Sequence, residues 1–194
     1  MKVYNTIVSR RTIRKFQQKP IKLSILKRMV NAGRLAPSAG NMQPLEYVIA
    51  VDDALREKIF PNVRWAGYIA PEGNPKSNER PAAYIIILVN KEISFSSFFK
   101  YDVGASAENI TLAALEEGIG CCWIGSFNRK KIQNILKIPV GYSVDLVLAL
   151  GYPLEDPEYY DIEKGKPIKY YKDASGVLHI PKRKLDDIIH IDYF

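Results

Sequence analysis

Residues 83–90 read Ala-Tyr-Ile-Ile-Ile-Leu-Val-Asn, an almost uninterrupted apolar run. A strand with one face in solvent alternates apolar and polar residues, whereas a strand covered on both faces is apolar throughout. The run is therefore predicted to be a strand that other layers of the protein cover on both sides.

Similar runs elsewhere in the chain predict further strands. Residues 45–51 and 142–150 have the length and apolar character of strands, and the second closes with Gly151-Tyr152-Pro153. The sequence Cys-Cys-Trp-Ile-Gly at 121–125 is predicted to be the buried end of another strand. Together these runs predict a central sheet.

Helical patterns separate the predicted strands. Apolar residues recur at helical spacing over 23–35 and 100–118, and Gly118 and Gly120 are expected to end the second helix. Shorter helices are predicted at 3–9, from Asp52 to about residue 60, and at 128–137. Helices that alternate with strands predict a layered α+β fold, and no linker divides the chain, so residues 1–194 are expected to form one domain.

Two segments lack these patterns. Residues 61–81 contain four prolines and two glycines, which predicts a long surface loop of the kind that often forms a functional lid. Hydrophobic density falls over 154–194, but an apolar pattern returns from Leu185 to the C-terminus. This C-terminal extension is expected to lie on another surface, for which a partner subunit is a candidate.

The composition is that of a globular protein: 47% of the residues are hydrophobic, 25% are charged, and the formal net charge is +7. No apolar run approaches the roughly 18 residues of a membrane span, and no secretory signal is recognisable, so we expect a soluble, cytoplasmic protein that binds no membrane. The positive charge is compatible with nucleic-acid binding, with simple solubility or with attraction of a polyanionic ligand.

Metal and triad chemistry have few candidate residues. His179 and His190 lack metal-ligand spacing, and neither a Gly-x-Gly-x-x-Gly nor a Walker motif occurs, so no metal site is expected. The adjacent Cys121 and Cys122 lie in an apolar stretch and are expected to be small core hydrophobes, with a redox role as the alternative.

Two basic clusters are candidates for phosphate binding. Arg10-Arg11-Thr12-Ile13-Arg14 combines guanidinium forks with a hydroxyl, and Lys182-Arg183-Lys184 follows far along the chain. The two clusters could converge on one phosphate, or they could be separate solvated patches.

Three further segments have features of a ligand site. The loop at 36–44 combines small residues with the amides of Asn41 and Gln43, which suit the edge of a heteroaromatic ring. Gly125, after Ile124, could let a planar ring rest against the backbone, although a strand end is an equal interpretation. The cluster Phe95, Phe98 and Phe99 could line a pocket or pack in a core or dimer contact.

The order and spacing of these segments resemble the FMN-dependent nitroreductase family from near residue 4 to about 190. The resemblance implies a nitroreductase-like α+β fold, with a central mixed, mostly antiparallel sheet flanked by helices. It also implies an interlocked homodimer with two FMN sites at the subunit interface, each lined by both chains.

The resemblance assigns roles residue by residue. The residues that hold the FMN phosphate and ribityl chain correspond to Arg10, Arg11 and Thr12. The cation near the flavin pyrimidine edge corresponds to Arg14. A loop from the other subunit corresponds to Pro37, Ser38, Ala39 and Asn41, with Gln43 as an added member. The segment facing the isoalloxazine, with a backbone N–H toward N5, corresponds to Ile124 and Gly125. The basic pair that reaches the phosphate from the C-terminal part of the family's chain corresponds to Lys182 and Lys184, and Arg183 between them could take the place of either.

The implied activity is ping-pong transfer of hydride from NAD(P)H through FMN to a small organic acceptor such as a nitroaromatic, a quinone or a flavin. No side chain is required as a nucleophile, and Arg14 is a candidate electrostatic stabiliser of the reduced flavin. The chain departs from the family pattern at Leu45, where many members have Trp, and in the long 61–81 loop.

Two alternatives stay open on the sequence. One is a flavin-binding protein of the same fold with another reaction, such as dehalogenation or flavin fragmentation, or with little turnover. The other is a basic nucleic-acid-binding module, which predicts a contiguous basic face. Interspersed carboxylates from Glu116 to Asp187 and the lack of a nucleic-acid motif disfavour the second, so no nucleic-acid partner is expected.

Overall fold

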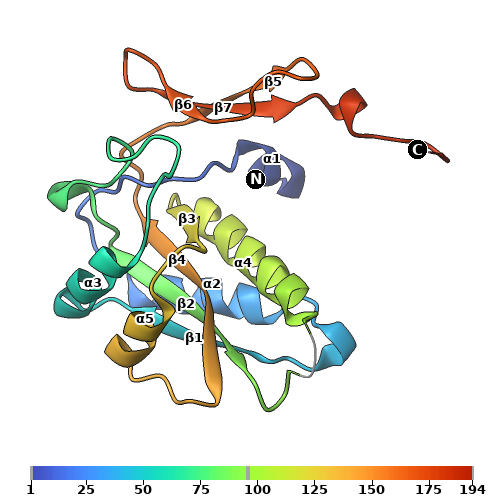
Figure 1. Cartoon of the computed structure of the whole chain (residues 1–194). Coiled ribbons are helices and arrows are strands. Elements are labelled where there is room, and N and C mark those ends of the chain that lie inside the picture. The colour runs from blue at the N-terminus through green and yellow to red at the C-terminus, as the bar shows by residue number, and fades with distance from the viewer. Residues whose placement is uncertain (1, 95–96, 194) are drawn as a thin grey trace.

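The computed structural model describes residues 2–94 and 97–193 (Figure 1). Its core is a four-stranded sheet in the order β1-β2-β4-β3, formed by Leu45–Ala50, Ala83–Asn90, Tyr142–Gly151 and Gly120–Ile124 respectively. Neighbouring strands are antiparallel, and a parallel bridge between Thr12 and Cys121 extends the sheet beyond β3. The predicted central, mixed and mostly antiparallel sheet is confirmed.

Helices cover both faces of this sheet. The face that carries Ile85 and Ile87 packs against α2 (Leu23–Arg34) and α4 (Phe99–Glu116). The face that carries Tyr84 and Ile86 packs against α3 (Asp53–Ile59) and α5 (Arg129–Ile135). Alternate residues of β2 therefore enter two different cores, and each of these four side chains is at most 1% exposed. This confirms the prediction of a strand buried on both faces.

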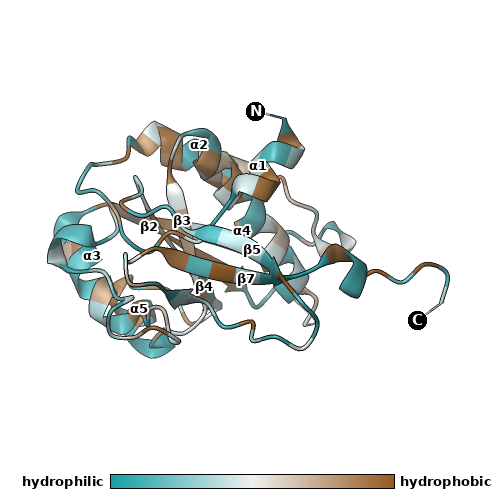
Figure 2. Ribbon diagram, turned by 90° about the horizontal axis from the view of Figure 1, so that it is seen from above, coloured by the Kyte–Doolittle hydropathy of each residue, from teal (hydrophilic) through white to brown (hydrophobic). Residues whose placement is uncertain are grey.

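The C-terminal part forms a second sheet that the sequence did not predict. Its strands β5 (Glu158–Ile162), β7 (Leu178–Arg183) and β6 (Tyr171–Lys172) lie in that order, with β5 and β7 parallel and β6 and β7 antiparallel. Figures 1 and 2 show this sheet beside helix α1 (Val3–Ser9) and the N-terminal segment, at the end of the molecule away from β1. A short 3-10 turn at Leu185–Asp187 follows β7.

Two expectations need correction. The 61–81 segment is not wholly a surface loop, because Val63, Trp65 and Ala66 are at most 8% exposed and belong to the core beneath α3 and α5. Short 3-10 turns lie at Phe60–Asn62 and Ser77–Glu79. In β3, which was predicted to be buried, Trp123 is 40% exposed, and its indole N–H donates to the Thr111 hydroxyl of α4 at 2.8 Å.

Two glycines allow the N-terminal segment to lie against the sheet edge. A Cβ added at Gly120 would lie 2.6 Å from Cβ of Ile13, and one added at Gly151 would lie 2.7 Å from Cβ of Phe16. Side-chain carbon atoms do not pack this closely, so both positions require glycine. The close approach fixes the residues that carry the first basic cluster.

Candidate functional site

The basic segment is held along β3 and β4 by backbone hydrogen bonds. The Ile13 N–H donates to the Cys121 carbonyl at 3.1 Å, and the Leu154 N–H donates to the Lys15 carbonyl at 2.9 Å. The Phe16 N–H donates to the Glu79 carbonyl at 2.9 Å, which ties the end of the 61–81 loop to the same segment. The backbone around Arg10, Arg11 and Arg14 therefore has a defined position.

Arg10 and Arg11 differ in their charge partners. Arg10 Nε lies 3.4 Å from a carboxylate oxygen of Glu108 on α4. The partly buried Arg11 guanidinium lies 4.0 Å from the centroid of the Tyr159 ring on β5, and within the described part of the chain no ion pair involves it. Burial lowers the pKa of Arg11, which means that its charge is incompletely compensated. An anionic ligand would supply that compensation.

A cavity of about 600 Å³ adjoins these two arginines. Most of its lining is apolar, from Ile13, Leu115 and Ile119 among others, and Glu155 and Asp156 also line it. Thr12, Arg14 and the later basic cluster are outside this lining. One chain therefore provides a basic rim and an apolar wall, but the cavity does not gather all of the predicted phosphate-binding residues.

The late basic cluster lies at the same end of the molecule. Lys182 and Arg183 are at the end of β7, and Lys182 pairs in register with Asp161 of β5. Tyr159, the residue against which Arg11 packs, lies on β5 as well. Lys184 forms an ion pair with Glu163, which raises the pKa of the lysine. Both basic clusters thus adjoin the second sheet (Figure 1), and their convergence on one phosphate stays a prediction.

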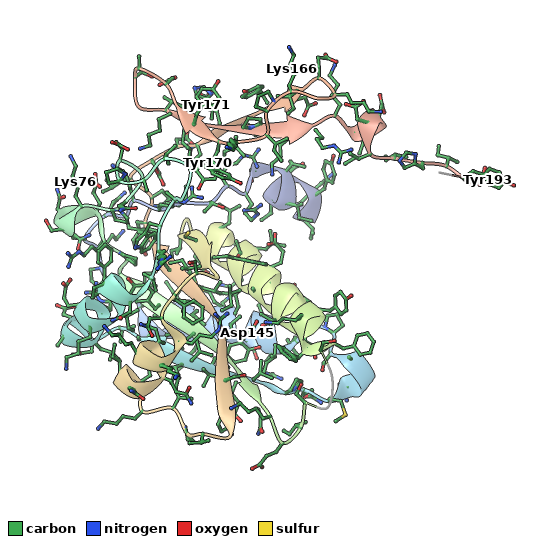
Figure 3. All side chains as sticks on the ribbon, in the orientation of Figure 1. Lys76, Asp145, Lys166, Tyr170, Tyr171 and Tyr193 are labelled. Atoms are coloured by element: carbon green, nitrogen blue, oxygen red, sulfur yellow. The ribbon has the colours of Figure 1, made fainter. Side chains whose placement is uncertain are left out.

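Arg14 is linked to the 61–81 loop through Tyr170 of the C-terminal extension. Its guanidinium packs on the ring of Tyr170, which in turn lies 5.0 Å from the ring of Tyr68 in the 61–81 loop. Figure 3 shows Tyr170 between the second sheet and the N-terminal segment. The loop does reach a predicted site residue, but sequence reasoning identified neither tyrosine, because ring–cation contacts between distant segments leave no local pattern.

The 36–44 loop is held by a buried carboxylate. Asp102, 5% exposed in the first turn of α4, accepts hydrogen bonds from Ser38 Oγ at 2.9 Å and from the Ala39 N–H at 3.0 Å. The Ser38 hydroxyl also accepts from the Gln43 N–H at 2.9 Å. Asp102 was not predicted as a site residue; the only available signal was a carboxylate among the apolar residues of a helix. Its role is to fix the loop.

The loop backbone has an unusual conformation. Gly40, Asn41 and Gln43 all have positive φ, at 57°, 53° and 51°. Asn tolerates this region better than most residues, whereas Gln is rarely found there. The turn leaves Ala39 and Asn41 exposed, with Pro37 exposed beside them. The loop therefore presents its small and amide side chains outward.

The 36–44 loop and the cavity beside the basic segment contact different turns of α4. The loop contacts the first turn of the helix, whereas the cavity beside Arg10 and Arg11 reaches Thr111 and Leu115 near its last turns. Asp102 and Leu115 are 13 residues apart, about 20 Å along the helix at 1.5 Å per residue, and Glu108, the ion-pair partner of Arg10, lies between them. This separation is compatible with a loop that serves the site of another subunit.

The phenylalanine cluster is described in part. Phe98 and Phe99 line a cavity of about 210 Å³ together with Ala39 and Met42 of the loop, and Phe98 is 58% exposed. Phe95 lies outside the described residues. The two described rings thus adjoin the predicted partner loop, and Phe99 also packs against the core on the α2 and α4 side of the sheet.

The predicted flavin-facing segment ends β3. Ile124 is 3% exposed and its side chain enters the core, so only its backbone is available to a ligand. A Cβ added at Gly125 would meet nothing within 4 Å, which means that the glycine borders open space. A planar group can approach the backbone there.

Residues 2–94 and 97–193 are the described part of the chain. These residues contain no cluster of three or more His, Cys, Asp or Glu side chains suited to a metal ion. Helices with the length and apolar character to cross a membrane are likewise missing from them. Burial raises the pKa of Cys121 to about 12 and that of Cys122 to about 11, so both thiols stay protonated at neutral pH.

Comparisons with known proteins agree with this picture. The sequence model of the nitroreductase family matches residues 7–152. A protein of Archaeoglobus fulgidus, provisionally named NADH dehydrogenase/NAD(P)H nitroreductase, is 29% identical over 163 residues, which are 81% of this chain and 88% of that protein. An NADPH-dependent oxidoreductase of Staphylococcus aureus strain RF122 is 27% identical over 79% of this chain and 66% of its own length.

Solved structures show the same fold. A nitroreductase family protein from Clostridium novyi superimposes with a TM-score of 0.67 and 29% identity, over 79% of this chain and 87% of that chain. An FMN-dependent nitroreductase from Clostridium difficile superimposes with a TM-score of 0.70 and 22% identity, over 98% and 99% of the two chains.

Proposed function

Because the chain belongs to the nitroreductase family, we propose that it is an FMN-dependent oxidoreductase that takes hydride from NAD(P)H and passes it to a small organic acceptor. Nitroaromatics, quinones and flavins are the acceptor classes in question. The names of the Staphylococcus aureus relative and of the Clostridium difficile enzyme support NADPH and FMN. The observation that carries the proposal is the partly buried Arg11, which has no carboxylate partner among the described residues and lies at the end of the molecule where the second basic cluster also lies.

The residues present fit FMN. Its phosphate needs several cations, which Arg10, Arg11 and Lys182 supply, and Lys184 can join them by exchanging Glu163 for the phosphate. Its flat ring needs backbone without side chains, which Gly125 supplies. Thr12 adds a hydroxyl within the same segment.

FMN supplies the hydride-transfer chemistry when it is bound. The chain contributes binding, orientation and charge. Arg14 would supply a positive charge beside a bound flavin, where it would favour the added negative charge of the reduced ring. The backbone after Ile124 would offer an N–H to a bound flavin ring, and no side chain is needed as a nucleophile. NAD(P)H and the acceptor would bind at this open face in turn, in a ping-pong scheme.

The site is completed by a second copy of the chain. Each subunit contributes its 36–44 loop to the other subunit's flavin, so the loop and the basic segment act in different sites. The C-terminal extension packs on the partner. Several of its apolar side chains have no cover in one chain, with Leu185 64%, Ile191 80% and Tyr193 88% exposed, and Figures 1 and 2 show the segment extending away from the rest of the chain.

The test is spectroscopic. The purified protein should be yellow, should release FMN rather than FAD on denaturation, and should lose its flavin absorbance when NADH or NADPH is added without oxygen. Oxidised absorbance should return with a nitroaromatic or quinone, and the particle should have the mass of a dimer. A protein that stays colourless after incubation with FMN, or that binds DNA with a steep salt dependence instead, would contradict the proposal.

A further inference from the structure

Another cavity, lined mainly by polar residues, lies beside the predicted flavin-facing segment. It has a volume of about 430 Å³ and lies between the turn that follows α3 and the start of α5. Its polar lining consists of two cations, two amides and a hydroxyl: Arg64, Lys131, Asn62, Asn128 and Ser126. Carboxylates are missing from this lining.

Backbone pairing fixes the walls of this cavity. Val63 and Phe127 form an antiparallel bridge, the Arg64 N–H donates to the Ser126 carbonyl at 2.9 Å, and the Asn128 N–H donates to the Asn62 carbonyl at 2.8 Å. Residues 62–64 of the loop therefore run directly beside residues 126–128. These hydrogen bonds hold the 61–81 loop in a defined position at this point.

The same pairing directs the cations outward. Val63 and Trp65 are 6% and 7% exposed, whereas Arg64 between them is exposed, so its side chain points away from the core. Lys131 is exposed on α5, while its neighbour Ile132 is fully buried and holds the helix in place. Both cations thus project from a fixed backbone.

The charge of the cavity has no internal compensation. In the part of the chain that the structure describes, neither Arg64 nor Lys131 takes part in an ion pair. Two cations with a hydroxyl and amides form a set suited to phosphate oxygens. Ser126 directly follows Gly125, where the flavin ring is proposed to lie.

We propose that the cavity lined by Arg64, Ser126 and Lys131 binds the phosphate groups of the pyridine dinucleotide while its nicotinamide lies on the flavin. This inference rests on the proposed function. The cavity adjoins the flavin-facing backbone, because its lining residue Ser126 directly follows Gly125 in the chain. The 61–81 loop, through Arg64, then contributes to the choice of hydride donor.

The experiment uses the FMN-loaded enzyme and its Arg64→Gln, Lys131→Gln and double variants. Flavin reduction is followed without oxygen in a stopped-flow instrument, with NADPH, NADH and 1-benzyl-1,4-dihydronicotinamide as donors. The last donor has the nicotinamide ring but no phosphate. Lys130→Gln is the matched control, because Lys130 is an exposed cation of the same helix that does not line the cavity.

The double variant should require a roughly tenfold higher concentration of dinucleotide for half-maximal rate, with the limiting rate unchanged. The benzyl donor should react normally with every variant, and Lys130→Gln should resemble the parent. An effect on NADPH alone would assign the cavity to the 2′-phosphate, and an equal effect on NADH would assign it to the pyrophosphate; both support the inference.

Unchanged dinucleotide dependence, with normal reduction by the benzyl donor, would overturn the inference and leave the proposed function intact. A uniform loss with all three donors would also overturn it, because the residues would then act on the flavin or on the fold. If no donor reduces the parent enzyme, the proposed function itself fails, and the inference fails with it.

Discussion

The Arg14 guanidinium lies 4.9 Å from the centroid of the Tyr170 ring, in the geometry of a cation–π contact. Tyr170 also contacts Tyr68, and Lys169 Nζ lies 5.5 Å from the centroid of the Tyr68 ring. One ring thus joins the N-terminal basic segment, the 61–81 loop and the C-terminal extension. The position of Arg14, and with it the charge at the proposed pyrimidine edge, depends on this contact.

Replacing Tyr170 should loosen the loop. Tyr170→Leu removes the cation–π contact and the contact with Tyr68, which together stabilise the arrangement by about 1–2 kcal/mol. Limited proteolysis should cut the variant faster within 61–81, and the midpoint of urea unfolding should fall. Tyr171→Leu is the control, because the Tyr171 ring stacks on His179 and is not among the contacts of Arg14 or Tyr68. Equal cleavage of the two variants would contradict the assignment.

Adding a methyl group at the sheet edge should be costly. Gly120→Ala and Gly151→Ala each place a Cβ within 2.7 Å of a core side chain at its Cβ, where rotation cannot relieve the overlap. Each should lower the free energy of unfolding by roughly 1–3 kcal/mol, measured by urea denaturation. Gly67→Ala, at a site with nothing within 4 Å, should have little effect. A neutral result at both edge positions would mean that the 12–16 segment does not pack as described.

The two adjacent buried thiols, Cys121 and Cys122, should make the free energy of unfolding fall in alkaline solution. Burial raises the pKa of Cys121 and Cys122 from the ordinary 9.0 to about 12 and about 11. A raised folded-state pKa means that the unfolded chain releases its protons first, so stability is lost as pH rises from about 9 toward those values.

The loss above pH 9 should approach about 1.4 kcal/mol per pH unit for each thiol. The double variant Cys121→Ala, Cys122→Ala should therefore show a shallower decline between pH 8.5 and 10 than the parent, whatever its stability at pH 7. Parallel curves would show that the thiols are not buried. In the native parent at pH 8, both should also resist alkylation.

The central sheet was predictable because a strand that is buried on both faces is a continuous run of apolar residues. Residues 83–90 are apolar at nearly every position, and the helix signals at Asp52 and Gly118 are local. The second sheet has no such run. In β5 only Ile162 is buried, and β6 has two residues, so neither strand shows a run or an alternation. Its pairing joins segments separated along the chain.

In the candidate site, too, the contiguous segments could be predicted from the sequence, whereas residues that act through contacts with distant segments could not. Arg10, Arg11 and the 36–44 loop were recognised because they are contiguous motifs. Asp102 and Tyr159 were missed, because each acts through contact with a residue far away in the sequence. Cofactor binding, the two-chain site and the cytoplasmic location stay predictions.

A site shared between two chains can be tested by subunit complementation. Arg11→Gln should weaken FMN binding by roughly 10–100-fold, since charge-assisted hydrogen bonds to phosphate are worth about 1.5–3 kcal/mol. Ala39→Trp places a large ring on the exposed loop, where it should block the partner's flavin. At an FMN concentration well below the weakened Kd, each homodimer should then be nearly free of FMN.

The decisive measurement is the FMN content of the heterodimer of these two variants, purified with two different affinity tags. In a shared arrangement, one site combines the intact Arg11 of one chain with the intact loop of the other, so half of the sites should bind FMN and be reduced by NAD(P)H. A heterodimer as empty as the two homodimers would show that both segments serve the site of the same chain, and would contradict the account.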